Sequence, residues 1–300
     1  MNQEKIFNQE DEINLSEILQ LFWSSKFIII SIVFTFAVGS VFYSLSIPNK
    51  FTSSSTLIMI GESGQSMSGL GMLGSLPGLN IGISKGMNVV VPTIGSRDFL
   101  RHLLEFKDVK PVLAAFKEYD RDNKKIIFNK EVYDPQTELF TKDLTKMPSF
   151  QRIYDRYRAL IAVSRDDKLG YMQVSVTHES PEFAFYLLSL IIDEINNKSR
   201  KKDAIESQAS LDFLYKELTK TKIIEIRDSI NKVITSVLKS QTMAEVKTDY
   251  IISPLDSPFF PELKSSPNRP RICILGTILG FFIGILTILI WHFGFTKRTK

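Results

Sequence analysis

Cysteine and histidine are scarce in this chain of 300 residues. Cys273 is the only cysteine, so no disulfide can form within one chain and packing alone must hold the fold. His102, His178 and His292 are scattered, with no partner at the spacing of a metal site. The sequence has no phosphate-binding loop, no HExxH motif and no G-x-S-x-G motif. It therefore predicts a protein that is not an enzyme and binds no cofactor or metal.

Dense charge of one sign is also missing. The formal net charge is only +4, and the basic residues do not gather in one run. Nucleic-acid binding needs a concentrated basic face. We therefore expect no nucleic-acid partner.

Two stretches lack charge altogether, Phe27–Ile47 and Ile272–Phe295. A bilayer core about 30 Å thick needs roughly 20 apolar helical residues, so each stretch can span it as a helix. Two crossings return the chain to the side on which it began. The predicted parts are a leader (1–26), a first transmembrane helix (27–47), a central domain (48–253), a proline-rich segment (254–271), a second transmembrane helix (272–295) and a tail (296–300).

The first span reads as a retained anchor, because the leader is acidic and no small-residue cleavage pattern follows the span. Lys26 and the basic tail after residue 296 favour cytoplasmic termini. Lys50, Arg269 and Arg271 flank the spans on the other side and argue against this orientation. On balance we expect both termini in the cytoplasm and the central domain across the membrane. The leader from 11 to 26 also has the pattern of a short amphipathic helix.

The central domain shows mixed strand and helix patterns. β-branched residues predict a strand over 51–60, and two β-like runs, 157–164 and 171–178, predict a hairpin. Helices are expected over 93–106, capped near Thr93 or Ser96, from Pro111 onward, and over 149–160. A glycine- and methionine-rich stretch, 61–88, is expected to be a loop, and 120–148 to be irregular surface.

From Glu182 to Ser253 the sequence contains no glycine and no proline. Apolar residues recur there every three or four positions, except in a polar patch near 196–210, which we expect to face water. The pattern predicts one long projecting helix over about 181–245. Some 55 helical residues would extend roughly 80 Å at 1.5 Å per residue. A broken helical hairpin is the alternative, although no breaker residue marks the break.

Prolines crowd the approach to the second span. Prolines at these positions are expected to exclude both helix and strand, so this approach is predicted to be an extended, stiff, polyproline-like path. An ordinary proline-rich linker is the simpler alternative. The prolines are Pro254, Pro258, Pro261, Pro267 and Pro270.

Small residues repeat on one face of the second span, at Gly276, Gly280 and Gly284. Such spacing lets helix backbones approach closely in lipid. The first span could supply the opposing surface through Ala37, Gly39 and Ser40. The alternative is that glycine is simply frequent in transmembrane helices.

Several segments together resemble the polysaccharide co-polymerases, the Wzz-type O-antigen chain length determinant family. These segments are DEINLSEILQLFWSSK, IPNKFTSSSTLIMI, SRDFLRHLL, SPEFAFYLLSLIIDEINN and DYIISPLDSPFFPELKSSPNRPR. The last is the most specific, with Pro258, Pro261, Pro267 and Arg269 matching ahead of the glycine-bearing span. The long glycine- and methionine-rich stretch departs from the family's pattern and leaves the subfamily open.

The resemblance implies an α+β periplasmic domain between two transmembrane helices, with a membrane-proximal mixed sheet and one very long projecting helix. It also implies a homo-oligomeric ring in the bacterial inner membrane that controls the chain length of a lipid-linked glycan made by a partner polymerase. An adaptor of a capsule or exopolysaccharide export machine is the alternative. Because only TKRTK follows the second span, neither a kinase nor a sensor output domain is expected.

Overall fold

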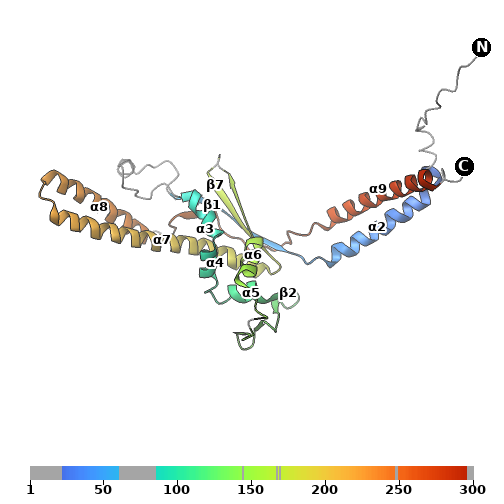
Figure 1. Ribbon diagram of the computed structural model, residues 1–300, viewed down its shortest axis with the longest axis horizontal. Helices are drawn as coiled ribbons and strands as arrows, with labels where there is room; N and C mark the ends of the chain where they lie inside the picture. Colours follow the sequence, from blue (N-terminus) through green and yellow to red (C-terminus); the bar gives the residue numbers. More distant parts are fainter. Residues whose placement is uncertain are drawn as a thin grey trace, which may run out of the picture. The chain divides into compact units, whose positions relative to one another are not determined.

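A computed structural model describes residues 22–60, 86–143, 145–166, 168, 170–246 and 249–295 (Figure 1). It divides into two compact units. One unit holds the chain up to Asn49 and from Ser265 onward, and the other holds Lys50–Lys264. The predicted leader helix falls almost entirely outside the described residues, as does most of the predicted loop 61–88. The end of that loop is helical instead, because α3 (Gly86–Ile94) begins within it.

The unit Lys50–Lys264 is built on a four-stranded sheet in the order β6-β7-β1-β8. The strands are β1 (Phe51–Met59), β6 (Ile161–Asp166), β7 (Tyr171–His178) and β8 (Ile252–Asp256). The strand over 51–60 and the hairpin are confirmed, with Ile161 opposite Val176 in the hairpin. Every pairing in this sheet is antiparallel, so the expectation of a mixed sheet is wrong.

The long helix α7 (Pro181–Lys220) packs on this sheet. Alternate β1 residues are buried, ending in Leu57 and Met59, and they face the same core as Val174 of β7. The first half of α7 adds Leu187 and Ile191 to that core. Burying large aliphatic side chains stabilises a fold by about 1.5–3 kcal/mol each. The period-two pattern of β1 and the helical pattern of α7 thus meet in one hydrophobic core.

Shorter elements complete the core. Ser96 caps α4 (Arg97–Leu103) by accepting the Phe99 N–H at 3.0 Å, and Ser149 caps α6 (Phe150–Leu160) in the same way. Both predicted helices are therefore confirmed. The helix expected from Pro111 is wrong at its end, because α5 (Val109–Ala115) gives way to a strand at Phe116.

Small hairpins replace much of the predicted irregular surface. The first pairs β2 (Phe116–Asp120) with β3 (Lys125–Phe128), and the second pairs β4 (Tyr133–Asp134) with β5 (Leu139–Phe140). Their turns follow side-chain chemistry: Asp120 accepts the backbone N–H groups of Asp122 and Asn123. Short polar side chains of this kind commonly stabilise turns.

The single helix predicted over about 181–245 is wrong beyond Lys220. Helix α7 begins where expected, but the backbone is extended at Thr221 and a second helix, α8 (Ile224–Val246), runs back beside α7 (Figure 1). Leu211, Ile234 and Val237 are buried where the two helices meet. A continuous helix would leave these apolar residues in water, so the hairpin gains their burial although no glycine or proline marks the break. At 40 residues, α7 is about 60 Å long rather than the predicted 80 Å.

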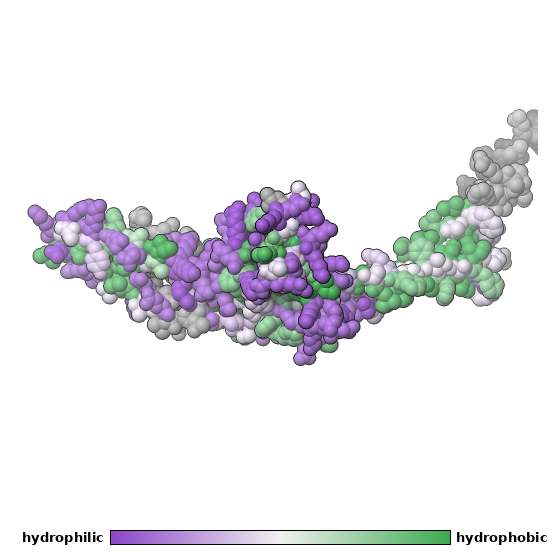
Figure 2. Space-filling view, turned by 90° about the horizontal axis from the view of Figure 1, so that it is seen from below, coloured by the Kyte–Doolittle hydropathy of each residue, from purple (hydrophilic) through white to green (hydrophobic). Residues whose placement is uncertain are grey.

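The other unit contains two helices, α2 (Lys26–Ser46) and α9 (Arg269–Phe295), which pack side by side. They fall close to the two predicted spans. Figure 2 shows mostly hydrophobic surface on this helix pair and mostly hydrophilic surface on the unit Lys50–Lys264. The surface of the helix pair therefore suits lipid, whereas the surface of the unit Lys50–Lys264 suits water.

Candidate functional site

Within the described residues, two helices are long and apolar enough to cross a membrane, Lys26–Ser46 and Arg269–His292. In α2 only Ser44 is fully buried, whereas large side chains such as Phe27, Phe34 and Phe42 are exposed. A core helix of a water-soluble protein would bury one face. These exposed side chains suit a lipid environment instead.

In α9, Gly276, Gly280 and Gly284 lie directly against α2. A Cβ added at Gly276 would collide with the Ser40 side chain, 2.9 Å from its Oγ atom. A Cβ at Gly280 would come within 2.6 Å of the Phe36 Cβ atom, and one at Gly284 within 3.5 Å of the Ile29 Cγ2 atom. Gly276 and Gly280 therefore permit a close approach of the two backbones, as small residues do in lipid.

The opposing surface of α2 differs in part from the predicted one. Ala37 and Ser40 are half-buried on the contacting side, but Gly39 is exposed and has nothing near it. Phe36 and Ile29 make contacts that were not predicted. The pattern of small residues indicated Ser40 but not the larger residues Phe36 and Ile29. Following the helical period from Ser40 back through Phe36 would have found them.

The first part of the proline-rich segment is fastened to the sheet. Pro254 lies within β8, so the expectation that prolines exclude a strand here is wrong; β8 is an edge strand, where proline is tolerated. Beyond Pro254, buried serines of β1 bind the backbone of the segment through their side chains. Ser55 Oγ donates to the Asp256 carbonyl at 2.6 Å, and Ser53 Oγ donates to the Phe259 carbonyl at 2.8 Å.

The predicted motif residues of this segment are divided between the two units. Pro258 is half-buried and Pro261 is buried, both in the unit Lys50–Lys264. Pro267, Arg269 and Pro270 belong to the helix-pair unit. Pro267, Arg269 and Pro270 therefore share a unit with the three glycines, and Pro258 and Pro261 belong to the other unit.

Arg269 links the two helices at one end of the pair. It begins α9, and its Nη2 donates to Asn49 Oδ1 at 3.1 Å, just after α2 ends. Its Nε atom is buried without a hydrogen-bond partner. Pro270 lies in the first turn of α9, where a missing N–H costs nothing, and the Ser266–Pro267 peptide bond is cis.

Asn196 is the residue that the sequence reasoning missed. It lies in the stretch expected to face water, yet its side chain is buried. Its Oδ1 accepts the N–H groups of Ile251 and Ile252 at 3.0 and 3.1 Å, and its Nδ2 donates to the Ile252 carbonyl at 2.9 Å. It therefore fixes the start of β8 to α7. The only signal in the sequence was its position one residue after Ile195, on the edge of the apolar stripe.

Buried titratable groups serve the fold around the start of α7. Burial lowers the pKa of His178 to about 4, so its ring is neutral and accepts the Ser180 N–H at 3.0 Å. Burial and a hydrogen bond to Glu182 raise the pKa of the Tyr119 hydroxyl to about 12. Ser180 Oγ accepts the Phe183 N–H at 3.1 Å and caps the helix.

A side-chain hydrogen bond joins α4 to α7. His102 Nε2 and Glu194 Oε2 are 2.5 Å apart. Burial alone would raise the pKa of the Glu194 carboxyl, but hydrogen bonds from His102 and Asn197 outweigh it and lower that pKa. Among the described residues, no group of histidine, cysteine or acidic side chains could hold a metal ion.

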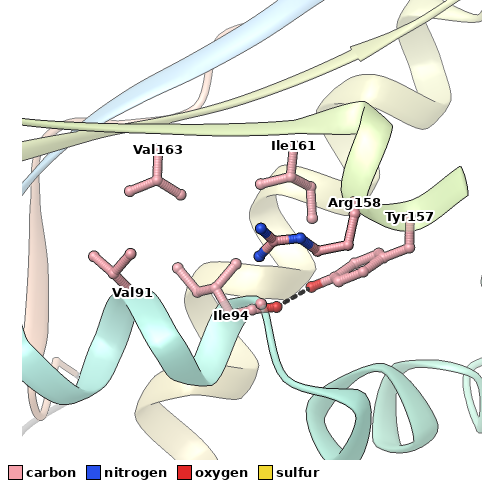
Figure 3. A pocket seen from close by; sticks show the side chains of 7 residues that line it. Val91, Ile94, Tyr157, Arg158, Ile161 and Val163 are labelled. Carbon is pink, nitrogen blue, oxygen red and sulfur yellow. Dashed lines mark hydrogen bonds between the residues drawn. The ribbon is translucent and has the colours of Figure 1, made fainter. Parts of the chain in front are cut away.

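A cavity of about 160 Å³ lies between α3, α6 and β6 (Figure 3). Val91, Ile94, Ile161 and Val163 form apolar walls, and the Arg158 side chain extends beside them. The Tyr157 hydroxyl is occupied by a 2.8 Å bond to the Ile94 carbonyl. The lining residues include no nucleophile paired with a base, so we assign no chemistry to this cavity.

Comparison with known proteins supports the resemblance found in the sequence. Residues 11–105, about a third of the chain, match the family model for the Wzz chain length determinant protein. This stretch includes the first span and β1. The family resemblance is therefore confirmed over these residues.

Among solved structures, the chain is similar to a full-length bacterial polysaccharide co-polymerase at 13% identity. The similarity covers 96% of this chain and 100% of that chain, with a TM-score of 0.42. No curated protein matches the chain.

Proposed function

We propose that this protein is a non-enzymatic, oligomeric regulator of the chain length of a surface polysaccharide, acting in the bacterial inner membrane with the polymerase. The observation that carries the proposal is the match of residues 11–105 to the chain length determinant model. The apolar helices α2 and α9 support a membrane location. The O-antigen or a related lipid-linked glycan is the substrate class that the family implies.

The proposed topology follows the predicted parts. The leader 1–26 and tail 296–300 lie in the cytoplasm, residues 27–47 and 272–295 cross the membrane, and the central domain 48–253 with segment 254–271 lies in the periplasm. The close α2–α9 contact supports treating the two spans as one unit of assembly. In this view Gly276, Gly280, Gly284 and Arg269 shape the membrane part of each subunit.

The proposed mechanism is geometric. Large apolar side chains stay exposed on the α7–α8 hairpin, among them Ile205, Phe213 and Ile224. Apolar surface of this kind commonly marks a protein–protein contact. Neighbouring subunits that cover this apolar surface of the α7–α8 hairpin would form a ring of fixed size. The membrane spans would contact the polymerase.

Deletion of the gene tests the proposal. A surface glycan with a banded length distribution should lose its preferred length in the deletion strain, and the intact gene should restore it. Electrophoresis of the glycan measures this distribution. An unchanged distribution would exclude the proposed role, whereas loss of surface glycan with intracellular accumulation would identify an export adaptor instead.

A further inference from the structure

Four large apolar side chains are exposed within nine residues of the proline-rich segment. Leu255 is 67% exposed, Phe259 49%, Phe260 47% and Leu263 85%. Single exposed apolar residues need no explanation, but a concentration of them marks a contact surface. We call Leu255–Leu263 the apolar strip.

The backbone of the apolar strip is held in place. Hydrogen bonds from Ser55 and Ser53 hold the carbonyls of Asp256 and Phe259, and Pro261 is buried against the domain. The ring of Phe260 rests against Phe185 of α7, with ring centroids 6.3 Å apart. The four exposed side chains are therefore attached to a backbone that is held in place.

The chain ties this strip to the start of a membrane-spanning helix. Five residues lie between Leu263 and Arg269, the first residue of α9, so Arg269 is six positions further along the chain. At no more than about 3.6 Å per residue, these six steps cover at most about 22 Å. The headgroup zone of a bilayer is itself several ångströms deep on each side. The tether therefore keeps Leu263 within about 22 Å of the start of α9, whatever the orientation of the domain.

We propose that the apolar strip inserts into the headgroup zone of the outer face of the membrane that α9 crosses. The inference relies on that crossing, which is part of the proposed function, and goes beyond it by naming a lipid contact of the central domain. Aromatic residues favour this zone because their rings suit the boundary between hydrocarbon and water. Asp256 and Glu262 within the strip and Lys264 directly after it carry both signs, which suits zwitterionic headgroups.

The exposure of the four side chains does not by itself identify lipid as their partner. Phe213 on the α7–α8 hairpin is 62% exposed, more than Phe260, yet no short connection ties it to a span. What distinguishes the apolar strip is its tether to α9. Phe213 therefore provides a control of the same residue type and similar exposure.

Fluorescence quenching by brominated lipid tests the contact. The full-length protein with both native tryptophans replaced (Trp23→Phe, Trp291→Phe) receives one new tryptophan, through either Phe260→Trp or the control Phe213→Trp. Each variant is reconstituted into vesicles of phosphatidylethanolamine and phosphatidylglycerol, with lipid brominated near the top of the acyl chain. We expect the Phe260→Trp variant to be quenched severalfold more than the Phe213→Trp variant. Phe259→Trp provides a second reporter if Phe260→Trp does not fold.

The unmodified protein distinguishes a failure of the proposed lipid contact from a failure of the proposed membrane crossing. Its native Trp23 and Trp291 lie near the ends of the spans and should be quenched if α2 and α9 cross the bilayer. Quenching of the native tryptophans without quenching of the Phe260→Trp and Phe259→Trp variants would overturn the lipid contact and leave the crossing intact. Unquenched native tryptophans would overturn both. Protection of the Phe260→Trp reporter from brominated lipid and from aqueous iodide alike would show that protein covers the strip, which also overturns the proposal.

Discussion

The α2–α9 pair and the α7–α8 hairpin are both antiparallel helix pairs, but they are packed by opposite means. In α2–α9 the contact is made where side chains are missing, at Gly276 and Gly280. In α7–α8 it is made by large side chains, Leu211, Ile234 and Val237. Water drives apolar side chains together, whereas lipid does not, so close backbone contact matters more in lipid. The difference teaches that the surrounding solvent decides which residues hold two helices together.

Acidification should lower the stability of the central domain, which contains the α7–α8 hairpin, more than that of the α2–α9 pair. This is the largest difference that we expect between the two regions. His178 has a pKa of about 4 in the folded domain against 6.5 in the unfolded chain, so the unfolded chain binds more protons between these values. Stability of the central domain is therefore constant above about pH 6.5 and falls as the pH drops toward 4, by up to about 3 kcal/mol. Glu194, whose pKa is lowered, adds to the loss at the acidic end.

Chemical denaturation of the protein in detergent across this pH range measures the effect. Near-ultraviolet signals of the central domain should disappear at lower denaturant at pH 4.5 than at pH 7. A His178→Gln variant should show a smaller change with pH. An equal change in the variant would assign the loss to other groups.

Asn196→Ala should weaken the attachment of β8 to helix α7. The substitution leaves the N–H groups of Ile251 and Ile252 and the Ile252 carbonyl without their side-chain partner. Unsatisfied buried groups cost about 1–3 kcal/mol, so we expect a loss of about 2–3 kcal/mol in the free energy of unfolding. Asn197→Ala, in which only the bond to Glu194 is lost, is the matched control and should cost less.

Ile234→Ala tests packing by large side chains in the hairpin. Removing a buried aliphatic side chain costs about 2 kcal/mol or more when the site cannot collapse. Local unfolding of α7–α8, measured by hydrogen exchange, should become easier while the sheet keeps its protection. The control Ile224→Ala removes an exposed side chain and should leave exchange unchanged.

Gly280→Leu tests the opposite kind of packing. Its Cβ atom would overlap the Phe36 side chain, and overpacking of this kind costs about 1–3 kcal/mol. The thermal midpoint of the helix pair in detergent should fall, and the glycan length distribution should broaden. Gly39→Leu adds the same side chain where nothing lies near, so it should be tolerated. Equal effects of the two substitutions would contradict a specific glycine contact.

Much of the fold could be predicted because it follows from local patterns. The spans followed from uncharged length, and β1 and the β6–β7 hairpin from β-like composition. The cap at Ser96 followed from a helix-start signal, and the start of α7 at Pro181 from helical spacing and the lack of glycine and proline. Each of these depends on residues close together in the sequence.

The errors share a different cause. Pro254 could join β8 because that strand lies at the sheet edge, and Asn196 is buried because the chain returns beside it as β8. Likewise Phe36 contacts Gly280 because of the rotation of one helix against another. A local pattern can place such a residue on one face of an element, but it does not say which distant segment that face meets.

The sequence by itself determined which segments suit lipid, which alternate as strands and where helices begin, because charge, period and capping are local properties. The tertiary structure alone decided that the stretch after Pro181 folds into a hairpin, that Ser53 and Ser55 hold the proline-rich segment, and that Gly280 contacts Phe36. The physical reason is that the free energy of burial and of long-range hydrogen bonds depends on residues far apart in the chain.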